Sequence, residues 1–320
     1  MPRLTENKII IVIRRTRLEE LIARYNTIDQ ARFYIEHLGA DFEDYLAEDR
    51  RYHQALSLVE RQMSKLGRVQ VLERSFVPNF TFGREDTVVA VGQDGLVANI
   101  LKYLEEQPVV AVNPDPARWD GLLLPFTAED SGGIVRDLFK SSRRRQEISM
   151  ALAEFNDGRK LYAVNDLFIG PKSHASARYL LESGSAQEVQ SSSGVIVSTG
   201  LGSTGWLKSL LAGAAGLNRL RQSTADGGPR NEVPADINEG CFAWAADHLF
   251  FSVREPFPSK TSGADLICGR VDADHPLVIT SQMPDNGVVF SDGLESDFLE
   301  FNSGQKVFIT LADKKGYLVV

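Results

Sequence analysis

The residues best suited to chemistry are Gly92-Gln93-Asp94-Gly95, which follow the short apolar run Thr87–Val91. Glycines let the backbone approach a phosphate closely, and a helix that begins here would direct its positive N-terminal end toward that phosphate. The Asp94 carboxylate could orient or deprotonate a hydroxyl group. A simpler interpretation is that Asp94 only caps a helix in a tight turn. The pattern alone leaves both open.

A second candidate is the segment Ser198-Thr199-Gly200-Leu201-Gly202-Ser203-Thr204-Gly205-Trp206. Its hydroxyls and bare N–H groups suit a nucleotide, and the indole of Trp206 offers a face for a base. The alternative is a flexible turn with Trp206 buried in the core. A Walker A loop is excluded because the Gly-Lys-Ser/Thr order is missing.

A third candidate is the polar pair Asn165-Asp166, which interrupts an apolar run between Leu161 and Ile169. Buried polar groups need partners, so either the local backbone or the hydroxyls of a ligand must satisfy this pair. The five histidines and two cysteines are scattered, so we assign no metal ligands and expect a reducing compartment.

These candidates must be positioned by two kinds of structure. Up to Pro125 the pattern predicts parallel strands and helices, and a strand-turn-helix-strand crossover places Gly92–Gly95 at the carboxyl end of its strand. The predicted strands are Ile9–Ile13, Val69–Leu72, Thr87–Val91 and Val109–Asn113, and the predicted helices are Ile28–Leu38 after Thr27, Asp44–Leu66 and Leu96–Leu104. The helices before Met63 either pack on the sheet or form an oligomer contact.

Beyond Pro125 short apolar runs and frequent turn residues predict a β-rich part. The expected strands are Gln146–Phe155, Lys160–Ile169, Ala177–Glu182, Val195–Ser198, Leu249–Val253, Asp265–Cys268, Leu277–Thr280, Val288–Phe290 and Lys306–Leu311. Between them we expect a helix over Gly202–Ala215 and a mobile insertion or long loop over Asn218–Gly240.

Composition excludes several classes of protein. The 320 residues are 43% hydrophobic and 24% charged, which is typical of one or two globular domains. A net charge of −8 argues against a nucleic-acid or anionic-membrane partner. The first apolar run, Ile9–Ile13, is too short for a signal peptide or a membrane span, so we expect a cytoplasmic protein.

Taken together, the three candidates resemble the NAD kinase family, whose members carry G-G-D-G after a strand, V-N-x-D-P after the next, an Asn-Glu pair and a serine/threonine/glycine loop that opens a helix. The matching segments are Gly92–Gly95, Val112–Pro116, Asn165-Asp166 and Ser193–Trp206, and the resemblance continues into Leu249–Pro256 and Ser291–Gly293. The later segments look most like the mitochondrial-type branch. Because the chain shows no transit peptide, we expect a bacterial relative.

The resemblance implies phosphorylation of the adenosine-ribose 2′-hydroxyl of NAD by ATP, with Mg²⁺ arriving with the ATP. Asp94 matches the proposed general base, Asn165 and Asp166 would lie beside the adenosine, and Thr204, Gly205 and Trp206 would line its base. The full set of implied binding residues is Gly92, Gln93, Gly95, Asn113, Asn165, Asp166, Ser193, Thr199, Gly202, Ser203, Thr204, Gly205, Trp206, Ser209 and Asp292.

The resemblance also implies a fold and an assembly. Residues 1–127 would form a Rossmann-like α/β domain with the GQDG turn, and residues 128–310 a β-sandwich-like, NAD-binding domain. Residues 311–320 would form a C-terminal strand that returns to the first domain. Family members are homo-oligomers, often dimers, and the chemistry is expected in the cleft between the domains.

The chain departs from the family pattern at three positions, namely Gln93 for the second glycine, Leu96 for a threonine and Asp166 for the usual glutamate. These departures leave two alternatives open: a kinase of the same fold with a sugar, nucleoside or lipid acceptor, or a dinucleotide-binding regulator without transferase activity. Because the motifs contain almost no Lys or Arg, we expect backbone N–H groups and Mg²⁺ to hold the anionic ligands.

Overall fold

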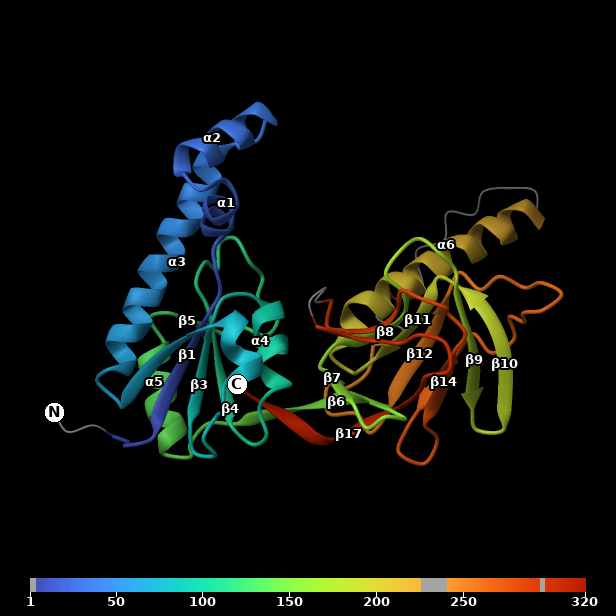
Figure 1. Ribbon diagram of the computed structural model, residues 1–320. Coiled ribbons are helices and arrows are strands. Elements are labelled where there is room, and N and C mark those ends of the chain that lie inside the picture. The colour runs from blue at the N-terminus through green and yellow to red at the C-terminus, as the bar shows by residue number, and fades with distance from the viewer. Residues whose placement is uncertain (1–3, 226–240, 294–296) are drawn as a thin grey trace. The chain divides into compact units, whose positions relative to one another are not determined.

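The computed structural model describes residues 4–225, 241–293 and 297–320, and the chain divides into two compact units. Unit 1 comprises residues 1–146 and 316–320, and unit 2 comprises residues 147–315 (Figure 1). None of the helices in the described ranges combines the length and apolar character needed to cross a bilayer.

Unit 1 is built on a parallel sheet in the order β2-β1-β3-β4, with β5 and the end of β17 both paired with β4. Its own strands are β1 Lys8–Ile13, β2 Arg68–Glu73, β3 Thr87–Val91, β4 Pro108–Asn113 and β5 Phe126–Thr127. The residues of β3 and most of β1 and β4 are buried, as their continuous apolar sequences predict.

The helices of unit 1 are α1 Arg17–Tyr25, α2 Ile28–His37, α3 Phe42–Met63, α4 Asp94–Leu101 and α5 Ser131–Phe139, with a 3₁₀ helix, η1, over Arg74–Asn79. The lower part of α3 packs with α5 against the sheet through Tyr52, Val59, Ile134 and Val135. Its upper part extends past the sheet, where α1 and α2 pack on it (Figure 1). The Thr27 side chain caps α2, as predicted.

Helix α5 is the element of unit 1 that the sequence analysis missed. Its first turn contains Ser131, Gly132 and Gly133, which are poor helix formers, so the local pattern resembles a loop. Ile134, Val135 and Leu138 nevertheless bury one face of α5 in the core of unit 1. Unit 1 therefore extends to Gln146, beyond the change that was expected at residue 127.

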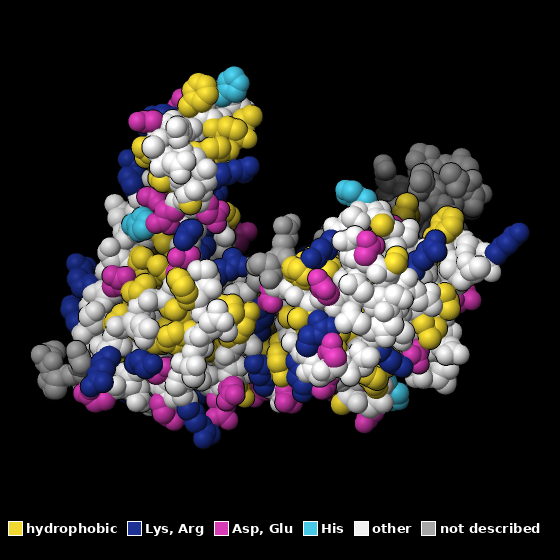
Figure 2. Space-filling model, viewed as in Figure 1, with side chains coloured by type: hydrophobic (Ala, Val, Ile, Leu, Met, Phe, Trp, Pro, Cys, Tyr) yellow, Lys and Arg dark blue, Asp and Glu magenta, His cyan; other side chains and the backbone are white. Residues whose placement is uncertain are grey.

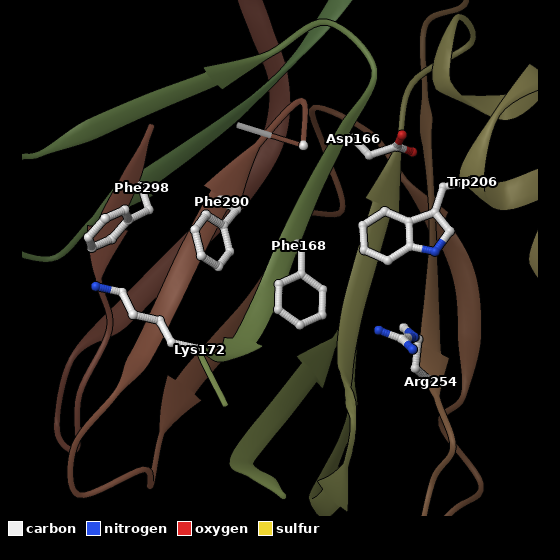
Figure 3. Close-up of a pocket in the computed structure, with 8 residues that line it drawn as sticks. Asp166, Phe168, Lys172, Trp206, Arg254, Phe290 and Phe298 are labelled. Carbon is white, nitrogen blue, oxygen red and sulfur yellow. The ribbon is translucent and has the colours of Figure 1, made fainter. Parts of the chain in front are cut away.

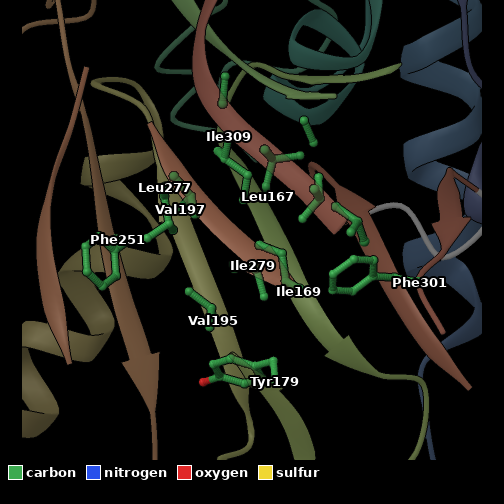
Figure 4. Packing of buried hydrophobic residues seen from close by; sticks show 14 of the residues in the cluster. Leu167, Ile169, Tyr179, Val195, Val197, Phe251, Leu277, Ile279, Phe301 and Ile309 are labelled. Atoms are coloured by element: carbon green, nitrogen blue, oxygen red, sulfur yellow. The ribbon is translucent and has the colours of Figure 1, made fainter. Parts of the chain in front are cut away.

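Unit 2 consists of antiparallel strands that bury one large apolar cluster (Figure 4). One set contains β6 Arg145–Phe155, β7 Lys160–Ala163, β9 Ala177–Ser183, β10 Ala186–Ser192, β14 Leu277–Ser281 and the first part of β17 Lys306–Val319. The second sheet has the order β13-β12-β11-β8-β15-β16, with β8 Asp166–Pro171, β11 Gly194–Ser198, β12 Leu249–Arg254, β13 Cys268–Val271, β15 Gly287–Ser291 and β16 Phe298–Glu300. Strands from both sets contribute to the cluster, for example Ile169 and Val197 on one side and Tyr179 and Ile279 on the other. The predicted combination of an α/β part and a β part agrees with this architecture.

Several element bounds in unit 2 differ from the prediction. The expected strand Lys160–Ile169 is broken at Val164-Asn165, β10 was missed, and β13 begins where the expected strand Asp265–Cys268 ends. A 3₁₀ helix, η2 Gly202–Thr204, precedes the helix α6 Trp206–Ala225. Helix α6 thus continues through the first residues of the predicted insertion Asn218–Gly240, whose residues 226–240 lie outside the described ranges.

Candidate functional site

The turn Gly92–Asp94 lies at the carboxyl edge of the unit 1 sheet, where β3 ends and α4 begins. Asp94 is the first residue of α4, and Gln93 occupies the N-cap position without a side-chain hydrogen bond. The Asp94 carboxylate accepts hydrogen bonds from the N–H groups of Leu122 (3.1 Å) and Leu123 (2.8 Å). The capping interpretation of Asp94 is therefore wrong, because its carboxylate bonds to a neighbouring loop.

The glycines of this turn have different environments. A Cβ on Gly92 would lie 2.8 Å from the Cδ2 of Leu96, whereas a Cβ on Gly95 would meet nothing within 4 Å. Leu96 is 2% exposed and packs beneath the turn. Gly92 is thus needed for close packing, and Gly95 leaves open space at the start of α4.

Asn113 positions the loop that holds Asp94. Its side-chain oxygen accepts the N–H of Asp115 (3.1 Å), and its amide donates to the carbonyl of Trp119 (2.9 Å). Gly121, with φ +63°, brings the chain back against the Asn113 amide. Asn113 therefore shapes the segment that leads to Leu122 and Leu123.

Ion pairs with α3 anchor the same loop. Arg118 binds Asp44, and Arg51 lies 3.0 Å from Asp115. Arg118 and Arg17, which both donate to the Asp44 carboxylate, hold its pKa well below its usual range. The loop that orients Asp94 is thus fixed by charged side chains as well as by Asn113.

Arg14 is a candidate site residue that the sequence analysis missed. It follows β1, the strand next to β3, and its Cδ lies 3.6 Å from the position that a Cβ would take on Gly92. The guanidinium donates to Glu48 (3.0 Å) and to the Arg15 carbonyl (2.9 Å). Its Nε is buried and makes no hydrogen bond to any residue that the structure describes. The Arg14 side chain, which is 13% exposed, thus places a positive charge beside the glycine turn.

In unit 2 the pair Asn165-Asp166 lies at the break between β7 and β8 and is held by Asp292. The Asp292 carboxylate accepts the N–H groups of Val164 (2.9 Å) and Asn165 (2.6 Å), and its own N–H donates to the Asp166 carbonyl (3.0 Å). Asp292 has φ +55°, a conformation that favours Gly, Asn and Asp. Its role here is to shape the backbone around Asp166.

Asp166 has a strongly perturbed carboxyl group. Burial raises its pKa to about 7, and the nearby Asp292 carboxylate adds to this shift, while a hydrogen bond from the Ser198 hydroxyl opposes it. The side chain of Asn165 makes no hydrogen bond to the described residues and is half-buried. The two polar side chains thus differ. Asp166 accepts a hydrogen bond from the Ser198 hydroxyl, whereas the Asn165 amide has no partner among the described residues and can bind a ligand.

The loop after β11 is a compact structure whose hydroxyls bond internally. Thr199 donates to the Val164 carbonyl (2.5 Å), Ser203 to the Gly200 carbonyl (2.7 Å), and Thr204 to the Leu201 carbonyl (2.9 Å). Thr199 and Ser203 are fully buried. The hydroxyls that were expected to suit a nucleotide therefore donate to backbone carbonyls of the protein instead.

Gly202 explains why this loop lies so close to the polar pair. A Cβ at Gly202 would lie 2.1 Å from the Asn165 carbonyl oxygen and 2.7 Å from the Asp166 Oδ1. Any larger residue would push the loop away from Asp166. Gly205 and Thr204 are exposed at the end of the turn, immediately before Trp206.

Asp166 and Trp206 line a pocket of about 530 Å³ that lies within unit 2 (Figure 3). Trp206 is 36% exposed, so the alternative prediction that it is buried in the core is wrong. Its ring stacks on Phe168 with 5.8 Å between centroids, and Phe290 and Phe298 continue this aromatic row at 6.2 and 5.5 Å. The row offers flat apolar surfaces to ring-shaped groups.

Two cations face the same pocket. The Lys172 Nζ lies 3.4 Å from the ring centroid of Phe298, and the Arg254 guanidinium lies 5.5 Å from that of Trp206. Arg14 lies beside the glycine turn in unit 1. The candidate sites therefore contain more positive charge than was expected from motifs with almost no Lys or Arg. The three cations lie outside the glycine motifs: Arg14 follows β1, Lys172 follows β8, and Arg254 ends β12.

The remaining predicted residues lie around these elements. Ser193 precedes β11, at the end remote from Thr199, and donates its N–H to the Arg254 carbonyl (2.9 Å). Ser209 is exposed on α6, and its hydroxyl contacts the Gly205 carbonyl (3.3 Å). Among the described residues, the one group of three possible metal-binding side chains is Glu19, Asp49 and His53, none of which was predicted as a site residue. The aromatic row was also missed, although the outward position of Phe168 in a strand could have signalled it.

No protein-family model and no curated protein matches the chain. Solved structures do match it, and two of them cover nearly all of the chain. A yeast NADH kinase in complex with NADH has a TM-score of 0.55 and 12% identity, covering 99% of this chain and 84% of that one. An NAD kinase from Archaeoglobus fulgidus in complex with ATP has a TM-score of 0.53 and 16% identity, covering 98% and 93%. The chain therefore has the fold of NAD and NADH kinases.

Proposed function

We propose that the protein is an NAD kinase, which transfers a phosphoryl group from ATP to the 2′-hydroxyl of the adenosine ribose of NAD to give NADP. The observation that carries the proposal is the position of Asp94. Its carboxylate is held by two N–H groups at the carboxyl edge of a parallel sheet, where open α/β folds bind their ligands. The fold shared with NAD and NADH kinases supports the same activity.

In this proposal Asp94 orients the acceptor hydroxyl and takes its proton. Each of its carboxylate oxygens accepts one N–H bond, which leaves further lone pairs for the substrate. The positive charge of Arg14 and the first N–H groups of α4 attract phosphate oxygens of the donor. Mg²⁺ that arrives with ATP supplies the charge that offsets the transferring phosphoryl group.

The unit 2 pocket is proposed to bind the dinucleotide. Trp206 and Phe168 offer stacking surfaces for a base, and Asp166 together with the free amide of Asn165 can bind ribose hydroxyls. Lys172 and Arg254 supply positive charge for the diphosphate. The pocket thus provides aromatic, polar and cationic groups that match the three parts of such a substrate.

The proposal is tested by measuring ADP release with ATP and a panel of acceptors, with NADP followed by a coupled glucose-6-phosphate dehydrogenase. We expect NAD to be the best acceptor. ADP release that favours a sugar, a nucleoside, a lipid or NADH would assign a different substrate. Binding of NAD without ADP release from any acceptor would make the protein a dinucleotide-binding regulator.

A further inference from the structure

A cluster of possible metal ligands joins α1 to α3, away from the residues assigned to catalysis. His53 and Asp49 lie one turn apart on α3, and Glu19 comes from the first turn of α1. The His53 Nε2 lies 3.3 Å from a Glu19 oxygen and 3.5 Å from an Asp49 oxygen. All three candidate ligand atoms lie within 4.8 Å of one another.

The geometry differs from that of an ordinary histidine–carboxylate pair. His248 and His275 form hydrogen bonds to Asp247 (3.1 Å) and Asp272 (3.0 Å). His53 forms no hydrogen bond with either of its carboxylates within the described part of the chain. Its separations instead resemble the distance of about 3.3–3.4 Å between two ligand atoms of a tetrahedral ion with bonds of about 2.0–2.1 Å.

The two carboxylates are held in place by Thr16, the residue before α1. The Thr16 N–H donates to one Glu19 oxygen (2.8 Å), which leaves the other oxygen directed toward His53. The Thr16 hydroxyl donates to Asp49 Oδ1 (2.6 Å), the same oxygen that lies 3.5 Å from His53. Hydrogen bonds of this kind orient metal-binding carboxylates before the ion arrives.

The charge of the cluster also favours a cation. Two carboxylates face a single imidazole, and the neighbouring Arg14 and Arg17 both bind a different carboxylate, Glu48, which is 2% exposed. Arg50 and Arg61 line the same surface hollow as Asp49 and His53, but neither forms an ion pair with Glu19 or Asp49 in the described part of the chain. Figure 2 shows acidic and basic side chains together with a histidine over this part of α1 and α3. The cluster is also half-open to solvent, with 39%, 21% and 47% of the side chains of Glu19, Asp49 and His53 exposed, so an ion can enter.

We propose that Glu19, Asp49 and His53 form a binding site for a divalent cation of the zinc type, with water in the remaining position. One imidazole and two carboxylates form a donor set that zinc accepts. The bound ion fastens α1 to α3 and so stabilises the helical part of unit 1. The inference is independent of the proposed kinase activity, because it involves none of the residues assigned to that reaction.

The test uses the full, untagged chain after treatment with a chelator. Calorimetry with Zn²⁺ alone should show one equivalent bound, and Co²⁺ alone should give the visible absorption of a tetrahedral site. His53→Gln should weaken Zn²⁺ binding at least about tenfold and abolish the Co²⁺ spectrum. The matched control is His275→Gln, which removes a histidine from a hydrogen-bonded pair without a third ligand and should bind Zn²⁺ as the parent does.

A second variant separates loss of a ligand from loss of folding. Asp49→Asn keeps an oxygen that accepts the Thr16 hydroxyl but loses the charge, so it should fold like the parent and bind Zn²⁺ at least about tenfold more weakly. Zn²⁺ should raise the melting temperature of the parent and of His275→Gln only. Failure of the parent to bind one equivalent, or equal binding by His53→Gln, would overturn the proposal.

Discussion

Arg14 and Asp94 come from different strands and reach the same edge of the unit 1 sheet. Strands β1 and β3 are parallel neighbours, with Val12 opposite Ala90, so the residues that follow each strand emerge together. Asp94 has its carboxylate fixed by Leu122 and Leu123, and Arg14 keeps one buried donor unused. This edge therefore combines a positioned carboxylate with a positive charge.

We predict that Arg14→Gln raises the KM for ATP by about 10-fold to 100-fold, because one hydrogen bond to a charged group is worth about 1.5–3 kcal/mol. Steady-state kinetics with varied ATP measures this change. Arg17→Gln is the control, since it also removes a partner of Glu48 but belongs to α1. An equal rise in KM for both variants would show that the effect comes from Glu48 alone.

Asp166 should make the stability of the protein depend on pH. Its folded pKa of about 7 lies above the ordinary carboxyl value of 3.8, so the folded state retains a proton that the unfolded state releases. The free energy of unfolding contributed by this group therefore falls as the pH rises from about 4 to about 7. Between pH 5 and pH 8 this loss amounts to up to about 2–3 kcal/mol.

Asp166→Asn removes this dependence. Urea unfolding should show the variant gaining stability relative to the parent between pH 5 and pH 8. Asp157→Asn in the same unit is the control, because the pKa of Asp157 is lowered and its carboxyl group stays ionised throughout this range. If the difference between Asp166→Asn and the parent did not change with pH, the Asp166 carboxyl would be ionised in both states.

At the scale of elements, the turn between β11 and α6 places Trp206 beside Asp166. The turn can lie this close because Gly202 presents no side chain to the Asn165 carbonyl, 2.1 Å from where its Cβ would stand. The buried hydroxyls of Thr199 and Ser203 stabilise the turn by donating hydrogen bonds to backbone carbonyls. This close contact lets the turn bring Trp206 to the same pocket as Asp166.

We predict that Gly202→Ala destabilises the protein by more than about 3 kcal/mol and weakens NAD binding, because the clash involves backbone atoms that cannot rotate away. Thermal unfolding and calorimetry measure the two effects. Gly213→Ala on α6 is the control, since a Cβ there meets nothing and should add up to about 1 kcal/mol of helix stability. A Gly202→Ala protein as stable as the parent would contradict this account of the turn.

Elements with strong local patterns were predictable, and those defined by distant contacts were not. Thr87–Val91 was predicted with its observed bounds because a continuous apolar run fits a buried parallel strand. Helix α5 and strand β10 lack such patterns and form because they pack or pair with distant residues. Arg14 and the aromatic row were not predicted, because they too are brought into place by contacts between distant residues. Asp94 and Asp166 were predicted because they stand in recognisable sequence motifs.

For the whole molecule, net charge describes the candidate sites poorly. The chain carries −8, yet Arg14, Lys172 and Arg254 supply positive charge where the proposed anionic ligands would bind. A charge count averages over the surface and cannot reveal such local groupings. The fold, shared with NAD and NADH kinases at 12–16% identity, positions each of these groups within its own unit but does not fix the substrate.

The most direct test of the central claim is the rate of NADP formation from NAD and ATP by the parent, Asp94→Asn and Asp86→Asn. Asp86 is a matched control, since it is buried and accepts the Gly83 N–H (2.8 Å) beside the other end of β3. We predict that the parent forms NADP, that Asp94→Asn loses at least about 100-fold in kcat with NAD binding retained, and that Asp86→Asn keeps the parental rate. NADP formation by Asp94→Asn at near the parental rate would contradict the account.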